Sequence, residues 1–232
     1  MSTYKGVGTV VFDLDGTLVD SALDLVPSLN RTTARYGLSP VSYEQICKVV
    51  GHGGRMMIQR AFELNDHPID DLLLDKLLPC FFADYENNIS NNTKFYEGCL
   101  DALDVLAADG WKLAVCSNKH EKLVRKLLCS LREEKRFAAI TGGDTFNEKK
   151  PDPAHLLRTI QLANGHRSSS IMVGDSNSDI SAARGAGIPV IAVDFGYTDV
   201  PVSDLNPDAI ISHFSKLIGA MNAITDARDQ QE

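Results

Sequence analysis

The stretch Thr9-Val10-Val11-Phe12-Asp13-Leu14-Asp15-Gly16-Thr17 decides the fold. Its first four residues are apolar or β-branched, which is typical of a short buried strand in a parallel sheet. The strand ends at one carboxylate, Asp13, and a second, Asp15, follows two residues later. Gly16 gives the chain the freedom to turn at this point, so both carboxylates can reach one site.

Similar apolar runs recur along the chain, and single helical patterns separate them. We predict strands at residues 112–116, 170–173 and 190–193, and a weaker one at 138–141. The helical patterns cover residues 98–108, 119–131, 153–163 and 179–186. Strands that alternate with single helices indicate a parallel sheet covered on both faces. With right-handed crossovers, the predicted fold is α/β, a doubly wound parallel sheet of the Rossmann-like kind.

Residues 21–92 break this alternation, because they contain no convincing strand. Helical patterns lie at residues 22–36, 43–50, 55–64 and 70–88. We therefore predict an inserted all-helical domain at 21–92. The α/β core then consists of residues 1–20 and 93–232.

Composition excludes several classes of protein. The 232 residues include 23 Lys and Arg against 31 Asp and Glu, which gives a net charge of −8. A general binder of nucleic acid or anionic membranes normally has the opposite sign, so we expect neither partner. The 5 cysteines form no Cys-x-x-Cys pair, which argues against a disulfide framework or a thiolate zinc site. Without a signal peptide or an apolar run of about 18 residues, we expect a soluble cytoplasmic protein, as a monomer or a homodimer.

Polar side chains follow the predicted strands at the edge where open α/β sheets bind ligands. In chain order they are Asp13, Asp15 and Thr17, then Ser117, Asn118 and Lys119, then Lys150, and finally Asp175 and Asp179. Carboxylates, a hydroxyl and an ammonium that follow separate strands are thus expected at one edge of the sheet. None of these residues on its own is specific for one kind of site, but their order along the chain and their placement after the strands are together specific.

These motifs resemble those of the haloacid dehalogenase superfamily of phosphohydrolases, and the resemblance covers essentially the whole chain. The motifs are Asp13-Leu14-Asp15-Gly16-Thr17-Leu18-Val19-Asp20-Ser21, Ser117-Asn118-Lys119, Lys150-Pro151-Asp152-Pro153 and Gly174-Asp175-Ser176-Asn177-Ser178-Asp179. Within the superfamily the chain looks most similar to bacterial phosphoglycolate phosphatases. The markers of that similarity are Val50-Gly51-His52-Gly53, Gly142-Gly143-Asp144, Phe195-Gly196-Tyr197 and Pro207-Asp208-Ala209-Ile210, some of which related phosphatases share.

The resemblance implies a Mg²⁺-dependent phosphatase that acts on a small phosphorylated metabolite, with 2-phosphoglycolate as the expected substrate. Asp13 would attack phosphorus and form an aspartyl-phosphate, and Asp15 would act first as general acid and then as general base. Magnesium prefers oxygen ligands. We expect these from the carboxylates of Asp13 and Asp175 and from the backbone carbonyl of Asp15.

The remaining core residues are expected to hold the phosphoryl group and order the site. Ser117 and Lys150 would bind phosphoryl oxygens, as a hydrogen-bond donor and as a charge. Thr17 and Asn118 are expected beside them as phosphate ligands. Asp179 would orient a metal-bound water or Lys150.

The resemblance implies that the helical insertion at 21–92 is a cap domain over the α/β catalytic core. In this cap, the glycine-rich segment 51–55 is the expected specificity loop. His52 and Arg55 are its candidate contacts to substrate, and a flexible helix–helix turn is the alternative. Lys48 and Arg60 are further basic residues near this loop.

Simpler interpretations remain for the core motifs. The first could be an ordinary turn, Ser117-Asn118 a helix cap, and Lys150 a solvated neighbour of Lys149. Asp179 could merely stabilise a helix N-terminus.

Two other functions are open at this level. A phosphosugar mutase would use the same aspartyl-phosphate but needs cap residues for a distal phosphate. A phosphoacceptor signalling domain has a similar acidic site, but it is about half as long and lacks an insertion. Dehalogenation is disfavoured because Asp15 would be superfluous, and phosphonatase chemistry would need a cap lysine, for which Lys48 is the obvious candidate.

Overall fold

Six parallel strands form the central sheet in the computed structural model, which describes residues 8–229. Their order across the sheet is β5 (Ala139–Thr141), β4 (Lys112–Cys116), β1 (Thr9–Phe12), β6 (Ser170–Gly174), β7 (Val190–Val193) and β8 (Ala209–Ile211). All neighbouring pairs are parallel. The order runs outward from β1 in both directions, as in doubly wound folds. The predicted α/β fold with a parallel sheet is therefore confirmed.

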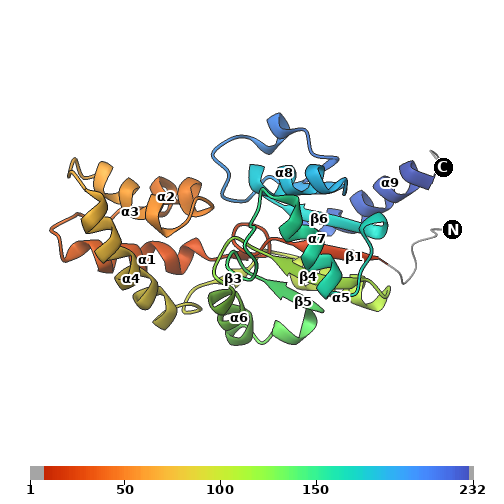
Figure 1. Ribbon diagram of the computed structural model, residues 1–232, viewed down its shortest axis with the longest axis horizontal. Helices are drawn as coiled ribbons and strands as arrows, with labels where there is room; N and C mark the ends of the chain where they lie inside the picture. Colours follow the sequence, from red (N-terminus) through yellow and green to blue (C-terminus); the bar gives the residue numbers. More distant parts are fainter. Residues whose placement is uncertain (1–7, 230–232) are drawn as a thin grey trace.

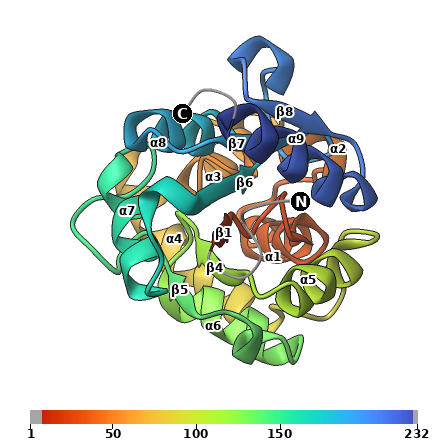
Figure 2. The ribbon, with the colours of Figure 1, turned by 90° about the vertical axis from the view of Figure 1, so that its right-hand side faces the viewer.

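Helices cover both faces of the sheet (Figure 2). Helices α7 (Pro153–Leu162) and α8 (Asn177–Ala186) lie on one face, and α5 (Cys99–Ala108), α6 (Glu121–Ser130) and α9 (Leu217–Asp229) lie on the other. Side chains of β1 alternate between them: Val11 packs in the cluster that contains α7 and α8, whereas Val10 and Phe12 pack in the cluster that contains α5 and α6. Because both faces are covered, the whole strand is buried, and its residues after Thr9 are apolar.

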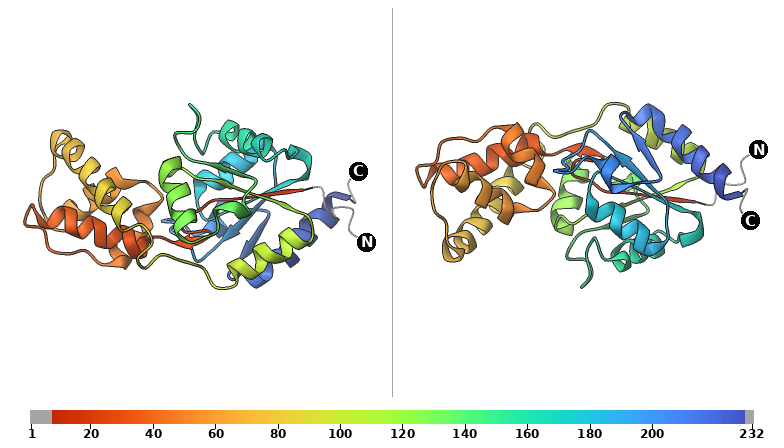
Figure 3. Two further views of the ribbon diagram at one scale, coloured as in Figure 1. Left: turned by 90° about the horizontal axis from the view of Figure 1, so that it is seen from below. Right: turned by 90° about the horizontal axis from the view of Figure 1, so that it is seen from above.

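Four helices lie beside the sheet rather than on it (Figures 1 and 3). They are α1 (Ala22–Ala34), α2 (Tyr43–Val50), α3 (Gly54–Glu63) and α4 (Asp71–Asn87), and we call residues 22–87 the helical insert. Two short antiparallel strands, β2 (Val19–Asp20) and β3 (Lys94–Phe95), carry the chain into and out of it. Both strands lie outside residues 21–92, and neither was predicted, because two-residue strands are too short to give a periodic signal.

Asp24 fastens the returning chain to the start of the insert. This buried carboxylate, on α1, accepts hydrogen bonds from the backbone N–H and the side-chain amide of Asn92. It also accepts hydrogen bonds from the backbone N–H and the hydroxyl of Thr93, at 2.7 and 2.8 Å. The first turn of α1 and the segment that leads out of the insert are therefore tied together.

The observed elements extend the sequence prediction at the C-terminal end. Strand β8 and helix α9 were not predicted, and short 3₁₀ helices lie at Glu134–Arg136, Arg167–Ser169, Val202–Leu205 and Phe214–Lys216. Helix α6 begins at Glu121, two residues later than expected. Over residues 8–229, none of the helices combines the length and apolar character that crossing a bilayer requires.

Candidate active site

The turn after β1 brings the carboxylates together. Asp13 directly follows the strand, and its N–H donates to the carbonyl of Val173 on β6. Gly16 then adopts a φ of +84°, a left-handed conformation that side chains disfavour. A Cβ atom at Gly16 would lie 2.5 Å from Asp175 Oδ2. Only glycine therefore lets this turn close against Asp175.

Lys150 lies between two of the carboxylates. Its Nζ is 3.0 Å from Asp13 Oδ1 and 2.7 Å from Asp179 Oδ1, and the lysine side chain is 1 % exposed. Burial alone would lower the pKa of Lys150, but Asp13 and Asp179 outweigh it and raise the pKa above its usual range. The ammonium is thus held charged at the edge of the sheet. This excludes the interpretation of Lys150 as a solvated surface residue.

The carboxylates of Asp13, Asp175 and Asp179 form a cluster whose oxygen atoms lie within 4.8 Å of one another. Burial raises the pKa of Asp13 to about 6 and that of Asp175 to about 8, and the neighbouring carboxylates add to both shifts. One ammonium therefore does not neutralise the cluster. Oxygen donors of this kind, with uncompensated negative charge, fit a hard divalent cation.

Asp175 is fixed on both of its oxygens. Thr17 Oγ1 donates to Oδ1 at 2.8 Å, and the N–H of Tyr197 donates to Oδ2 at 2.7 Å. The hydroxyl of Thr17 is thus directed at Asp175, and the role of Thr17 as a phosphate ligand stays a prediction.

Asp15 has two partners that the sequence analysis did not assign. Ser21 Oγ donates to Asp15 Oδ1 at 2.5 Å, and Lys119 Nζ lies 2.8 Å from the same oxygen. Lys119 Nζ also donates to the hydroxyl of Tyr85, on α4 of the insert, at 2.8 Å. Lys119 was visible as part of the second motif, but nothing local to it indicated either partner.

Ser117 and Asn118 lie on the loop after β4, at the same edge. Ser117 Oγ accepts a hydrogen bond from the N–H of Lys119 at 3.3 Å. The side-chain amide of Asn118 donates to the backbone carbonyl of Lys150 at 2.9 Å, which joins the second and third motifs. Both residues lie beside Asp13 in the cavity wall, and their roles as phosphate ligands stay predictions.

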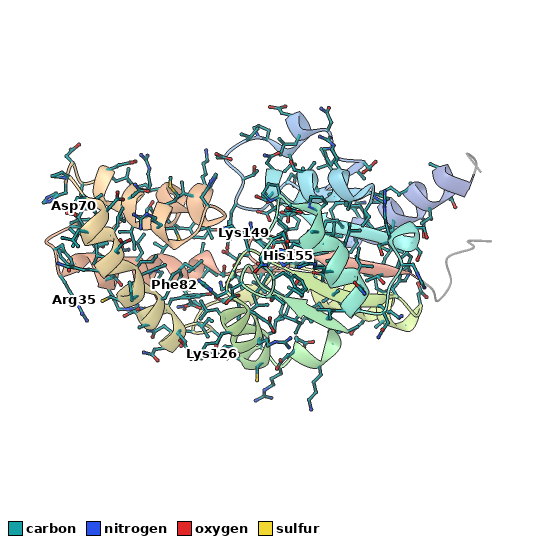
Figure 4. The ribbon with its side chains drawn as sticks, in the orientation of Figure 1. Arg35, Asp70, Phe82, Lys126, Lys149 and His155 are labelled. Carbon is teal, nitrogen blue, oxygen red and sulfur yellow. The ribbon has the colours of Figure 1, made fainter. Side chains whose placement is uncertain are left out.

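A cavity of about 290 Å³ separates the helical insert from the core. Asp13, Asp15 and Lys119 line its core wall, and Phe82 and Tyr85 line its insert wall. Figure 4 labels Phe82 on the insert and Lys149 on the core, at the two sides of this cavity. A smaller hollow of about 130 Å³ shares Asp13 and Asp15 and leads to Lys150 and Asp175.

The two candidate specificity residues line the cavity but already have partners. Arg55 binds Asp71 and Asp75 on α4, each at 2.6 Å. His52 Nε2 lies 3.5 Å from Asp199, which is on the core. The structure therefore places both at the cavity without directing a free charge from either into it, and their contact with substrate stays a prediction.

Residues 10–193 match the family model of haloacid dehalogenase-like hydrolases. The chain belongs to this family. It is 48% identical over 211 residues to a phosphoglycolate phosphatase of Agrobacterium fabrum, covering 91% of each chain. It is 46% identical over 208 residues to a phosphoglycolate phosphatase of Mesorhizobium japonicum, covering 90% of this chain and 92% of the relative.

A solved structure shows the same architecture. The crystal structure of a predicted phosphoglycolate phosphatase from Haemophilus somnus has a TM-score of 0.84 and 29% identity, and the match covers 92% of this chain and 97% of that one. The similarity to the haloacid dehalogenase superfamily and to phosphoglycolate phosphatases is therefore confirmed, and so is the prediction that the chain is an enzyme of this family.

Proposed function

We propose that this enzyme is a Mg²⁺-dependent phosphatase that hydrolyses 2-phosphoglycolate to glycolate and phosphate. The observation that carries the proposal is the position of Asp13, at the end of β1 and within 3.0 Å of a buried ammonium. Relatives that match about nine-tenths of the chain are named phosphoglycolate phosphatase, which supports this substrate.

In the proposed reaction, a carboxylate oxygen of Asp13 attacks phosphorus and an aspartyl-phosphate forms. Asp15 protonates the leaving alkoxide and then takes a proton from the water that hydrolyses the intermediate. Lys150 and Ser117 hold the phosphoryl oxygens, and Asn118 fixes the loop that carries Lys150. Asp179 keeps Lys150 in place through their 2.7 Å contact.

The cation site would be formed by Asp13 and Asp175, with the backbone carbonyl of Asp15 and with Asp179 beside them. The donor set fits, because three buried carboxylates offer oxygen atoms within 4.8 Å of one another. When bound, Mg²⁺ neutralises charge on the phosphate and helps to align it for in-line displacement. Thr17 and Tyr197 would orient Asp175 for this role.

The helical insert would act as the cap, within the proposed boundaries 21–92. It forms one wall of the cavity and is joined to the core by the β2–β3 ribbon, so its closure over a substrate would exclude water. We place the α/β core at 1–20 and 93–232. We expect a cytoplasmic enzyme without nucleic-acid or membrane partners, either as a monomer or as a homodimer.

A screen of small phosphate esters tests the proposal. With Mg²⁺ present, we expect release of inorganic phosphate and the highest kcat/KM with 2-phosphoglycolate. A rearranged product without phosphate release would instead identify a mutase. A single phosphorylation without turnover would identify a phosphoacceptor domain.

A further inference from the structure

The cavity contains a buried ammonium that the proposed chemistry does not use. Lys119 lies on its core wall, outside the cluster of Asp13, Lys150, Asp175 and Asp179, and its side chain is only 8% exposed. Its surroundings nevertheless keep it charged, because Asp15 and Tyr85 raise the pKa of Lys119 against the effect of burial.

Lys119 is held in place by two side chains, only one of which is a carboxylate. Its Nζ lies 2.8 and 3.1 Å from the two oxygens of Asp15 and 2.8 Å from the Tyr85 hydroxyl. An ammonium has three N–H donors. Within residues 8–229 its ammonium contacts one carboxylate and one hydroxyl, so an anion in the cavity would share these three donors with a single carboxylate, that of Asp15.

The other cationic residues of the cavity wall are less suited to hold an anion. Arg55 already binds two carboxylates, and the exposed Lys149 would contact an anion through water-screened charge. His52 lies 3.5 Å from Asp199, and His120 lies 3.1 Å from Asp144. Lys119 is therefore the cavity cation that combines burial with only one carboxylate partner.

The position of Lys119 also restricts where that anion can be. Under the proposed function, Asp15 contacts the oxygen that bridges phosphorus and the leaving group. Lys119 touches Asp15 directly, so a group on the carbon next to the bridging oxygen comes within its reach. An anion one or more carbons farther along would lie farther from Lys119.

We propose that Lys119 binds the carboxylate of the substrate and thereby selects phosphate esters of 2-hydroxy acids. This inference rests on the proposed function and names the residue that determines its specificity. It places recognition on the core, whereas the Tyr85 hydroxyl lets the insert orient the lysine.

The test uses matched esters and matched variants. Three substrates are compared: 2-phosphoglycolate, its neutral amide 2-phosphoglycolamide, and 3-phosphooxypropionate, whose carboxylate is one carbon farther away. We expect the wild-type enzyme to prefer 2-phosphoglycolate to the amide by about ten- to a hundredfold in kcat/KM, the range for a charge-assisted contact. The preference for 3-phosphooxypropionate over the amide should be much smaller.

Lys119→Met should abolish that preference, and Lys119→Gln, which keeps a polar group beside Asp15, is the second variant. Lys119→Arg should retain part of it. The control Lys149→Met removes an exposed lysine of the same cavity wall and should leave the preference intact.

The ratio between the two esters separates recognition from positioning. If Lys119→Gln lowers kcat/KM equally for 2-phosphoglycolate and its amide, Lys119 merely positions Asp15 and the inference is wrong. A wild-type enzyme that hydrolyses both equally well would also overturn it, while the phosphatase proposal stands. If the wild-type enzyme hydrolyses no ester of the series with Mg²⁺, the proposed function itself fails.

Discussion

The two walls of the cavity are built differently. On the core side, Asp13 lines the cavity and is 13% exposed, and behind it Lys150 and Asp179 are almost fully buried. All three follow strands of the sheet along the chain. On the insert wall, Arg55 and His52 are about half exposed, and their partners are also exposed. Bond-making needs fixed distances, which a sheet provides, whereas the insert is attached by a short ribbon and can adapt. We therefore expect substitutions on the two walls to differ greatly in effect.

Asp13→Asn should give the largest effect. The amide keeps the size of the carboxylate but is a poor nucleophile, so turnover should fall by about a thousandfold or more while the fold is kept. Steady-state phosphate release measures the turnover, and circular dichroism measures whether the fold is kept. Asp194→Asn, which changes an exposed aspartate bound to Ser212, is the control and should stay near wild type. Near-normal turnover of a folded Asp13→Asn enzyme would rule out the aspartyl-phosphate.

Exchanging the metal should have the next largest effect. Chelation should abolish activity, and Ca²⁺ should inhibit, because it takes more oxygen ligands at longer distances, about 2.3–2.6 Å against about 2.0–2.1 Å for Mg²⁺. The carboxylate of Asp13 could then bind through both oxygens and lose its freedom to attack. Phosphate release is measured after chelation and after adding back each cation. Full activity in the exhaustively chelated enzyme would contradict the assignment of the carboxylate cluster.

Asp24→Ala tests the contact that ties the start of the insert to the chain returning to the core. It leaves the buried N–H of Thr93 and the partly buried N–H of Asn92 without their acceptor, so the free energy of unfolding should fall by about 2–4 kcal/mol. Asp84→Ala, which removes the carboxylate bound to the exposed Arg31, is the matched control and should cost less than about 1 kcal/mol. Urea denaturation gives both values. If both variants lost the same free energy of unfolding, Asp24 would stabilise the fold no more than an exposed ion pair does.

Acid should destabilise the core through His155. Burial and the charge of Lys150 lower the pKa of His155 from 6.5 to about 4, so the folded protein keeps it neutral while the unfolded chain binds a proton. The contribution of neutral His155 to the free energy of unfolding is therefore lost as the pH falls from about 7 to about 5. Over that range, the wild-type free energy of unfolding should fall by about 1–2 kcal/mol more than that of His155→Leu.

Urea titrations at the two pH values measure this difference. His67→Leu changes an exposed histidine of the insert and should follow the wild type. A His155→Leu variant with the wild-type pH dependence would show that His155 titrates alike in the folded and unfolded states.

Arg55→Ala and His52→Ala should have the smallest effects. The guanidinium of Arg55 is already bound to Asp71 and Asp75, and both it and His52 are screened by water. We expect kcat/KM for 2-phosphoglycolate to fall by less than about threefold in each variant. Assays on 2-phosphoglycolate and on an aryl phosphate measure this. A tenfold loss of kcat/KM with 2-phosphoglycolate but not with the aryl phosphate would show that the insert recognises the substrate carboxylate.

Much of the core could be predicted from local sequence patterns. Strands Lys112–Cys116 and Val190–Val193 lie where their β-branched and apolar runs indicated, and the carboxyl ends of parallel strands necessarily meet at one edge. For this reason Asp13, Lys150 and Asp175 could be grouped from their positions in the sequence alone.

The contacts between insert and core could not be predicted in this way. Lys119 and Tyr85 are 34 residues apart and meet only because the C-terminal part of α4 lies beside the loop that follows β4. Asp24 is equally inconspicuous in sequence: an acidic residue near the start of a helix needs no further explanation, yet it binds residues 68 and 69 positions away. Such contacts depend on how two separately formed parts pack together.

The β2–β3 ribbon has a consequence for how the molecule can change. Because Val19 pairs with Phe95 and Asp20 with Lys94, the chain leaves the core and returns to it at neighbouring points. Residues between them can be lengthened, shortened or exchanged without altering the spacing of any strand in the sheet. The insert is thus a replaceable module, and a short turn joining β2 to β3 would close the core on itself. New substrate preferences can arise by exchange of one continuous segment, while the bond-breaking groups keep their positions.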